Sequence, residues 1–309
     1  MNTTTELSLT PRKSAKVTNS ISYGSSALPV ILFSTGVLGL STVAYLTKKY
    51  SCVPYLKYSV PTISWAGTEE PASIYYQCTL CFCGVLIFLL TLVVRNVYSI
   101  IIPENVRLLD IQWISGILNG ATMILLVMFS VDKFKFIHYI FAFFSFLSAL
   151  VFTTVGITIS KNICFHINST AIQTARSFLF IIQFASFLFG VAFLAFKNLD
   201  KSLYDEPDWL DLRDRKYSSR CGNFLKTIEK SQNVNSGEKS SDSVYMLKIP
   251  PYNWQTIHCF VSISEWLFVL VTLTNYGVYA FELKLIERRF KNMSLETETG
   301  NKTHSKLIR

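Results

Sequence analysis

Six charge-poor apolar runs dominate the sequence, and each is about long enough to cross a lipid bilayer. The runs are Ala27–Thr47, Cys78–Val94, Ile114–Val131, Ile137–Ile159, Ser177–Phe196 and Ile257–Phe281. A hydrocarbon core of about 30 Å requires about 20 helical residues, and roughly 17–25 are acceptable. Glu265 is the only fully charged residue inside the runs. The sequence therefore predicts an all-α membrane protein, a six-helix transmembrane bundle with an ordered first extracytosolic loop.

Composition supports this prediction only through the way the apolar residues are distributed. Hydrophobic residues make up 50% of the chain, but soluble proteins reach about the same fraction. The formal net charge of +9 does not predict a nucleic-acid partner, because the basic residues lie in tails and loops rather than in a stripe with interleaved aromatic residues. In those places Lys and Arg orient the helices and meet anionic lipid headgroups.

The chain divides into three parts. Residues 1–26 are rich in Ser and Thr and read as a disordered cytosolic tail. Residues 27–283 form the six-span membrane domain, with a long loop at 197–253. Residues 284–309 form a basic cytosolic tail. Its first turns carry Lys284, Arg288, Arg289 and Lys291, which serve as an orientation signal or as a contact for anionic lipid, including phosphoinositides.

Lys and Arg counts predict that both termini are cytosolic. With that orientation the cytosolic segments hold 14 of these residues and the short opposite loops hold 5, as the positive-inside rule requires. One observation opposes this orientation. All four N-x-Ser/Thr sequons, at Asn2, Asn168, Asn292 and Asn301, would then be cytosolic. A three-residue pattern arises often by chance, so the charges take precedence.

Glu265 is the most informative single residue, because an ionised carboxylate inside a bilayer costs about 2.5–3.5 kcal/mol on insertion scales. A helical wheel places it on one polar stripe of the last run, which should face other helices. The stripe comprises His258, Ser262, Glu265, Thr272 and Tyr276. Two interpretations stay open. The stripe either joins helices by hydrogen bonds to Asn119 or His138, or it lines a path for protons or lipid headgroups.

Cysteines and small residues have structural explanations. Cys52 and Cys78 flank the first loop and could form a disulfide on the non-cytosolic side, although sequence cannot fix the pairing. Gly36 and Gly39 allow close helix contact.

The sequence contains no zinc-binding Cys arrangement, HExxH, G-x-S-x-G or Walker loop. We therefore expect no enzyme activity, no cofactor and no metal.

The first loop contains a run of turn-forming residues between Pro61 and Pro71. Proline fixes φ and glycine allows positive φ, so Pro61, Gly67 and Pro71 favour one loop shape. Ile63 and Ser64 lie within it. As a bare pattern, this segment predicts an ordered extracytosolic lid.

Several elements, taken in order, resemble one family. They are P-x-I-S-x-x-G-x-x-x-P in the first loop, Arg95 after the second run, Asn119 in the third, His138 with Ala142 opening the fourth, and Ser264-Glu265-Trp266 with Phe281-Glu282 in the sixth. Together they resemble the DRAM/Sfk/Frag family, the damage-regulated autophagy modulators and their relatives, over about residues 27–196 and 254–283.

The resemblance implies a non-enzymatic regulator of autophagy, lysosomal function or membrane-lipid homeostasis that acts by binding lipids and membrane or cytosolic protein partners. It also implies a lysosomal or endosomal membrane as the location, with the plasma membrane as the alternative. Two other functions stay open. One is regulation of phosphoinositide kinases or lipid asymmetry at the plasma membrane, and the other is proton-coupled transport or channel activity that uses Glu265.

Overall fold

The structure is a computed structural model that describes residues 26–50, 62–68, 70–131, 133–167, 170–199 and 252–307. Side chains are described for these residues except 163–167, 193–199, 252–258, 290 and 293–307. Residues 1–25 of the predicted tail (1–26) and residues 200–251 of the predicted long loop (197–253) lie outside this set.

All regular elements in the described residues are helical, which confirms the predicted fold class. They are α2 (Ala27–Tyr50), the short α4 (Ile63–Ala66), α5 (Ala72–Ile101), the 3₁₀ turn η1 (Pro103–Asn105), α6 (Val106–Met128), α7 (Lys135–Ile167), α8 (Thr170–Leu199) and α10 (Tyr252–Leu307). Six of them are long and apolar enough to span a membrane.

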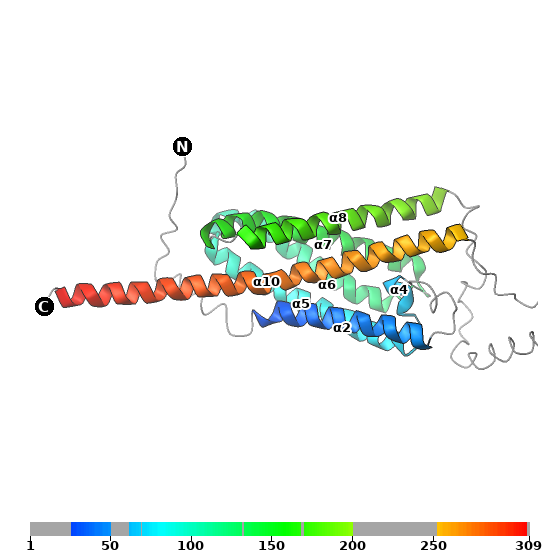
Figure 1. The fold of residues 1–309 in the computed structure, drawn as a ribbon, viewed down its shortest axis with the longest axis horizontal. Helices are drawn as coiled ribbons and strands as arrows, with labels where there is room; N and C mark the ends of the chain where they lie inside the picture. The colour runs from blue at the N-terminus through cyan, green and yellow to red at the C-terminus, as the bar shows by residue number, and fades with distance from the viewer. Residues whose placement is uncertain are drawn as a thin grey trace, which may run out of the picture.

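The long helices lie side by side along the long axis of the molecule (Figure 1), and each contacts its neighbours in a closed ring. The order around the ring is α2, α5, α6, α7, α8 and α10, and α10 contacts α2 again. Helix α10 also contacts α7 and α4, so it is the element that touches most of the bundle. The short α4 lies at one end of the bundle, here called the α4 end, and α10 extends beyond the opposite end (Figure 1).

The helices extend beyond the apolar runs from which they were predicted. Helix α5 begins at Ala72 and ends at Ile101, whereas the second run covers Cys78–Val94. Helix α10 continues through the basic tail as far as Leu307. A helix satisfies its own backbone hydrogen bonds, so it can pass from hydrocarbon into the headgroup region without changing structure. Apolar composition therefore marks the membrane-embedded part of each helix and not its ends.

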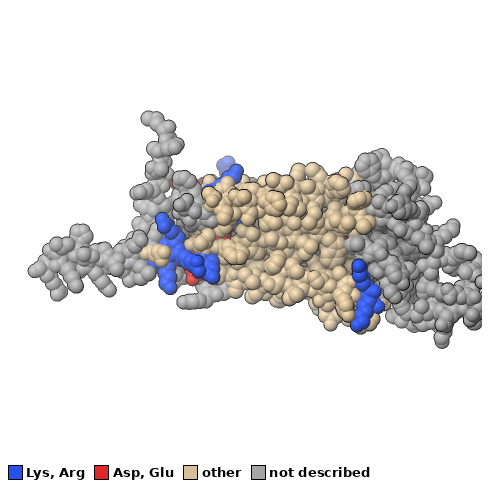
Figure 2. Space-filling model, viewed as in Figure 1, with Lys and Arg blue, Asp and Glu red and all other residues tan. Residues whose placement is uncertain are grey.

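The surface of the bundle has the charge distribution of a membrane protein. In the view of Figure 2, Lys and Arg lie at the two ends of the described bundle, and the band between them shows no charged side chain. Large apolar side chains of the candidate spans, such as Leu38, Phe178 and Ile181, are more than 60% exposed. Side chains of this kind would be costly in water and are stable against lipid tails.

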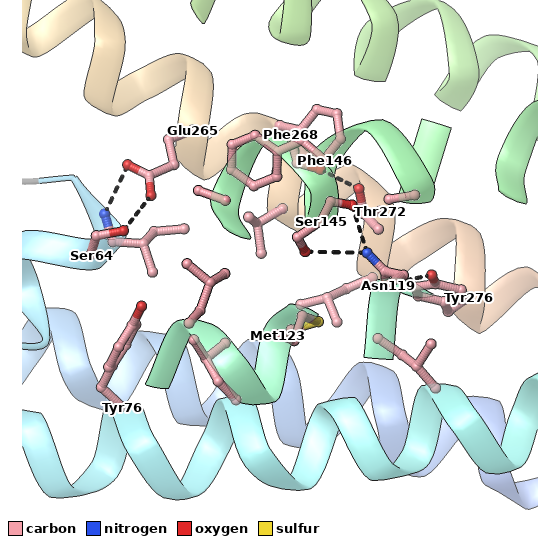
Figure 3. Close-up of a pocket in the computed structure, with 18 residues that line it drawn as sticks. Ser64, Tyr76, Asn119, Met123, Ser145, Phe146, Glu265, Phe268, Thr272 and Tyr276 are labelled. Atoms are coloured by element: carbon pink, nitrogen blue, oxygen red, sulfur yellow. Dashed lines mark hydrogen bonds between the residues drawn. The ribbon is translucent and has the colours of Figure 1, made fainter. Parts of the chain in front are cut away.

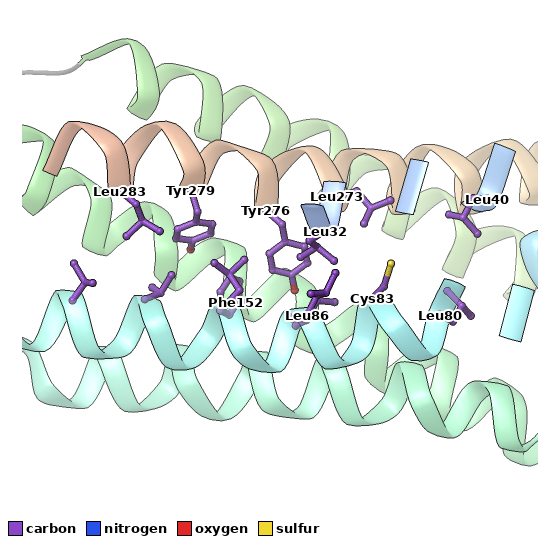
Figure 4. Packing of buried hydrophobic residues seen from close by; sticks show 14 of the residues in the cluster. Leu32, Leu40, Leu80, Cys83, Leu86, Phe152, Leu273, Tyr276, Tyr279 and Leu283 are labelled. Atoms are coloured by element: carbon purple, nitrogen blue, oxygen red, sulfur yellow. The ribbon is translucent and has the colours of Figure 1, made fainter. Parts of the chain in front are cut away.

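The apolar core lies where α2, α5, α7 and α10 meet (Figure 4). Leu32 and Leu40 of α2 pack with Leu86 of α5 and Leu283 of α10 in one cluster of buried residues. Glycines allow this close approach. A Cβ atom at Gly36 would lie 2.7 Å from the Leu273 side chain, and one at Gly39 would overlap the Thr79 side chain.

Candidate functional site

Helix α4 is one turn long, and its neighbours fix its position. The Thr62 hydroxyl caps the turn by accepting a hydrogen bond from the Trp65 amide at 3.3 Å. At its other end, the Thr47 hydroxyl of α2 donates to the Ala66 carbonyl at 2.8 Å. Ile63 and Trp65 are buried. The described part of the predicted loop motif is therefore an ordered cover at the α4 end of the bundle.

Gly67 has a different role from the one its residue type suggested. Its φ angle is −88°, so no left-handed conformation requires glycine there. A Cβ atom at Gly67 would instead overlap the Tyr76 ring of α5. The residue is small because the loop backbone lies directly against an aromatic side chain. Pro71 is the N-cap of α5, whereas Pro61 lies outside the described residues.

Glu265 faces α4 and binds it directly (Figure 3). Its carboxylate accepts hydrogen bonds from the Ile63 amide at 3.2 Å and from the Ser64 hydroxyl at 3.3 Å. The sequence had suggested Asn119 or His138 as the hydrogen-bond partner of the stripe. For Glu265 the partner is the loop, because α4 packs against α10 and brings two donors to the carboxylate.

His138 is linked to Glu265 through Ser64. Its Nε2 atom lies 3.0 Å from the Ser64 hydroxyl, and its Nδ1 atom lies 2.7 Å from the Phe129 carbonyl oxygen. The three side chains come from α7, α4 and α10, which are separated widely in sequence. They form a continuous polar line, here called the Glu265–Ser64–His138 line.

A cavity of about 60 Å³ lies beside this line, inside the ring of helices (Figure 3). This volume is enough for a few water-sized groups. Its walls come from α5, α6, α7 and α10 and are mostly apolar, with Leu80, Met123 and Phe268 among them. Glu265 and Ser64 line it near α4, and Asn119 and Tyr276 line it further along α10.

Asn119 joins three helices on the far side of the cavity. Its amide nitrogen donates to the Ser145 carbonyl of α7 at 2.7 Å, and its amide oxygen accepts from the Tyr276 hydroxyl of α10 at 2.9 Å. The side chain is 2% exposed. Here the stripe does join the helices, and the residue predicted as a partner contacts Tyr276 rather than Glu265.

We expect Asn119→Leu to lower the free energy of unfolding by about 1–2 kcal/mol. Interhelical hydrogen bonds in membranes contribute about 0.6 kcal/mol each on average, and up to about 1.7 kcal/mol. The change would be measured by reversible unfolding in mixed micelles. Tyr276→Phe is the matched variant, because it removes only one of the hydrogen bonds and should cost less than half as much. Equal losses for the two variants would contradict this account.

The other described members of the stripe also face the interior. Thr272 and Ser262 are buried. The Thr272 hydroxyl accepts from the Gln183 amide of α8 at 2.8 Å. Trp266 packs partly buried against the core. The His258 side chain lies outside the described set.

Sequence reasoning missed a second polar cluster at the end of the bundle opposite α4. Glu282 of α10 forms an ion pair with Arg176 of α8 at 2.5 Å, and both side chains are almost completely buried. The Tyr98 hydroxyl of α5 and the Ser160 hydroxyl of α7 also donate to Glu282, at 2.7 and 3.0 Å. The Arg176 guanidinium lies 3.7 Å from the centre of the Tyr279 ring. Four helices therefore meet around one carboxylate.

The remaining predicted residues lie on the surface or outside the described set. Lys284, Arg288, Arg289 and Lys291 are exposed on α10, from the last buried turn of the bundle onwards. Cys78 carries a free thiol on α5, and Cys52 lies outside the described residues, so their disulfide stays a prediction. Among the described residues, no group of three or more His, Cys, Asp and Glu side chains is placed to hold a metal ion.

The family model of the Frag1/DRAM/Sfk1/Cwh43P N-terminal domain matches residues 25–286. The chain belongs to this family. The match covers the whole helical bundle, from the start of α2 to the part of α10 that carries Glu282, and it confirms the resemblance seen in the sequence. Comparisons with curated proteins and with solved structures gave no match. The polar line, the cavity and the buried ion pair therefore all lie within the Frag1/DRAM/Sfk1/Cwh43P domain.

Proposed function

We propose that this multi-pass membrane protein is a non-enzymatic regulator of autophagy, lysosomal function or membrane-lipid homeostasis, which acts by binding lipids and partner proteins. Membership of the Frag1/DRAM/Sfk1/Cwh43P family supports the proposal. The observation that carries it is the course of α10, which passes without a break from the apolar bundle into a row of exposed cations.

The spacing of these cations suits a membrane surface. Lys284, Arg288 and Lys291 are four and three residues apart, so they lie on one face of the helix. All three are exposed. Each Lys or Arg close to an anionic leaflet contributes about 1 kcal/mol to the attraction. The row is therefore a contact for anionic headgroups, and phosphoinositides are the most highly charged of them.

The proposed function predicts that neutralising this row impairs function without unfolding the protein. Cells that lack the gene would be tested for autophagic flux and for lipid distribution across the plasma membrane, and then complemented. We expect the triple variant Lys284→Gln, Arg288→Gln, Lys291→Gln to restore less than half of the wild-type response, because about 3 kcal/mol of headgroup attraction is lost.

The matched control neutralises cations at the α4 end. Lys48 and Lys49 are exposed at the end of α2, and Lys48→Gln with Lys49→Gln should complement fully. The proposal fails if loss of the gene changes neither flux nor lipid distribution. Equal impairment by both sets of variants would contradict the assignment of lipid contact to α10.

The proposed location and orientation are a lysosomal or endosomal membrane with both termini in the cytosol. A C-terminally tagged protein would be imaged beside lysosomal and plasma-membrane markers. A cell-surface signal would favour the role in phosphoinositide-kinase or lipid-asymmetry regulation. Glycosidase treatment tests the orientation, because glycosylation at Asn292, on α10, would place the C-terminal end of that helix outside the cytosol.

A further inference from the structure

Glu265 and Glu282 lie on the same helix inside the bundle, but their surroundings differ in charge. Glu282 forms an ion pair with Arg176 of α8, whereas no described Lys or Arg forms one with Glu265. Acidic residues within membrane spans ordinarily pair with another group or mark a path for a ligand or an ion. The carboxylate of Glu265 therefore points to a cationic ligand.

Two donors of α4 orient the Glu265 carboxylate without using its whole capacity. The Ile63 amide donates to one carboxylate oxygen and the Ser64 hydroxyl donates to the other. A carboxylate offers about four acceptor positions, so a further donor can bind. Helix α4 is itself held against α2 by a hydrogen bond, which keeps both donors in place. The acceptor is thus positioned before any ligand arrives.

The cavity beside Glu265 is polar mainly at its two ends, and only one end has an acceptor to offer. Glu265 and Ser64 line the end near α4 (Figure 3). Asn119 and Tyr276 line the cavity about three turns further along α10, and they hydrogen-bond to each other. The walls between the two ends are mostly apolar. A molecule in the cavity would meet a carboxylate at one end and hydrocarbon side chains along the rest.

The volume of the cavity limits how much of a molecule it encloses. About 60 Å³ holds about four to six groups of the size of water, and a methylene group is of similar size. A primary ammonium group followed by about three to five carbons would fill this space.

We propose that the cavity binds the ammonium end of a primary alkylamine, with the cation on the Glu265 carboxylate and the first carbons of the chain against the apolar walls. The proposal goes beyond the proposed function, which assigns lipid contact to the cations of α10, and it does not depend on that function. An ammonium group has three donors and no acceptor, and its hydrogen bonds to a carboxylate are about twice as strong as those between neutral groups. The ligand gives Glu265 the positive charge that Arg176 gives Glu282.

Binding of three molecules with the same chain and different headgroups would test the proposal. Butan-1-amine, butan-1-ol and butanoate would be titrated calorimetrically into the full-length protein in lipid nanodiscs, with empty nanodiscs as the reference. We expect the amine to bind at least about tenfold more tightly than the alcohol, and butanoate to bind most weakly. Equal binding of amine and alcohol would overturn the proposal. So would the absence of binding by all three, which is the result for a cavity that holds only water.

A series of amines of increasing length tests the role of the apolar walls. Each methylene that enters an apolar site should tighten binding about fourfold, so affinity should rise from ethylamine to butan-1-amine and stop rising once the cavity is full. A constant affinity beyond that length would identify the amine end of a longer lipid chain as the ligand. A falling affinity would identify a short free amine. No dependence on length between two and four carbons would overturn the proposal.

Glu265→Gln removes the negative charge and retains the length of the side chain. Its affinity for butan-1-amine should fall at least about tenfold, whereas its affinity for butan-1-ol should not change. Glu70→Gln is the matched control, because Glu70 is an exposed carboxylate of the loop that carries α4, and both affinities should stay at the wild-type values. The proposal is wrong if folded Glu265→Gln binds the amine as the wild type does, or if Glu70→Gln causes an equal loss.

Ala142→Leu fills the cavity from α7 and leaves Glu265 unchanged, so it keeps the test decisive if Glu265→Gln fails to fold. Ala142 lines the cavity and is partly exposed. We expect butan-1-amine to lose its advantage over ethylamine in this variant, because the added carbons occupy the space of the chain. Ethylamine should still bind more tightly than ethanol. A chain-length series identical to that of the wild type would place the amine outside the cavity and contradict the proposal.

Discussion

Replacement of Glu282 by glutamine is expected to lower the free energy of unfolding by about 3–5 kcal/mol, which is the cost of leaving one partner of a buried ion pair without its counter-charge. The Arg176 side chain is 3% exposed and that of Glu282 is 0% exposed. Arginine cannot shed its proton to escape this situation. The positive charge would therefore remain inside the bundle.

Glutamine makes the test specific for charge, because it retains the length of the side chain and an acceptor oxygen. The hydroxyls of Tyr98 and Ser160 could still donate to that oxygen, as they do to Glu282. The loss therefore reports the missing counter-charge of Arg176 rather than a general loss of packing. The change would be measured by reversible unfolding in mixed micelles.

Asp110→Asn is the matched control, because it neutralises a carboxylate that also pairs with an arginine. Arg95 and Asp110 form a 2.7 Å ion pair whose side chains are 37% and 41% exposed. Exposed pairs contribute about 0–1 kcal/mol, so Asp110→Asn should change stability by less than about 1 kcal/mol. Similar losses for the two variants would show that Arg176 and Glu282 are solvated in the membrane protein.

The double variant Arg176→Met, Glu282→Leu distinguishes the stability that the ion pair contributes from the cost of leaving one buried charge without its partner. Replacing both members of a buried pair by apolar residues is often neutral or stabilising by about 1–4 kcal/mol. We therefore expect the double variant to be more stable than Glu282→Gln. A larger loss for the double variant would mean that the pair itself, and not the avoidance of an isolated charge, stabilises the bundle.

The two buried carboxylates show what the sequence could and could not predict. Glu265 lies in the middle of an apolar run, so its burial was expected from position alone. Glu282 and Arg176 each lie immediately outside a run, where a charge ordinarily meets lipid headgroups. Only the packing of α8 against α10 brings them together inside the bundle, and no local pattern encodes a contact between residues so far apart.

The first loop and the polar face of α10 show the same limit: sequence predicts local structure but not which distant residues come into contact. Turn-forming residues predicted an ordered first loop, and the part of it that the structure describes contains the capped turn α4. They did not predict that Ser64 would lie between Glu265 and His138, because each of these residues comes from a different element. Periodicity likewise predicted which face of α10 is polar. It could not assign the partners, since Thr272 contacts α8 and Tyr276 contacts α6.

Gly84 of α5 and Gly120 of α6 are expected to be the least replaceable glycines of the bundle. A Cβ atom at Gly84 would lie 2.7 Å from the Gly120 carbonyl oxygen, and one at Gly120 would lie 2.6 Å from the Gly84 carbonyl oxygen. Both oxygens belong to helix backbone, so neither can rotate away as a side chain could. An added methyl group must push the two helices apart.

We expect Gly120→Ala to lower the free energy of unfolding by about 3 kcal/mol, at the upper end of the range for overpacked cores. The matched controls are Gly190→Ala and Gly277→Ala, whose added Cβ atoms would lie 3.4 Å from Ser264 and 3.5 Å from Phe33, close to ordinary contact. Alanine is the better helix former by about 1 kcal/mol, so the controls should be neutral or stabilising. The same substitution should thus have opposite signs at different glycines, depending on whether the methyl group would overlap a neighbouring backbone or would lie at ordinary contact distance from a side chain. A destabilisation of equal size at all three positions would show that the α5–α6 contact is not the tight one.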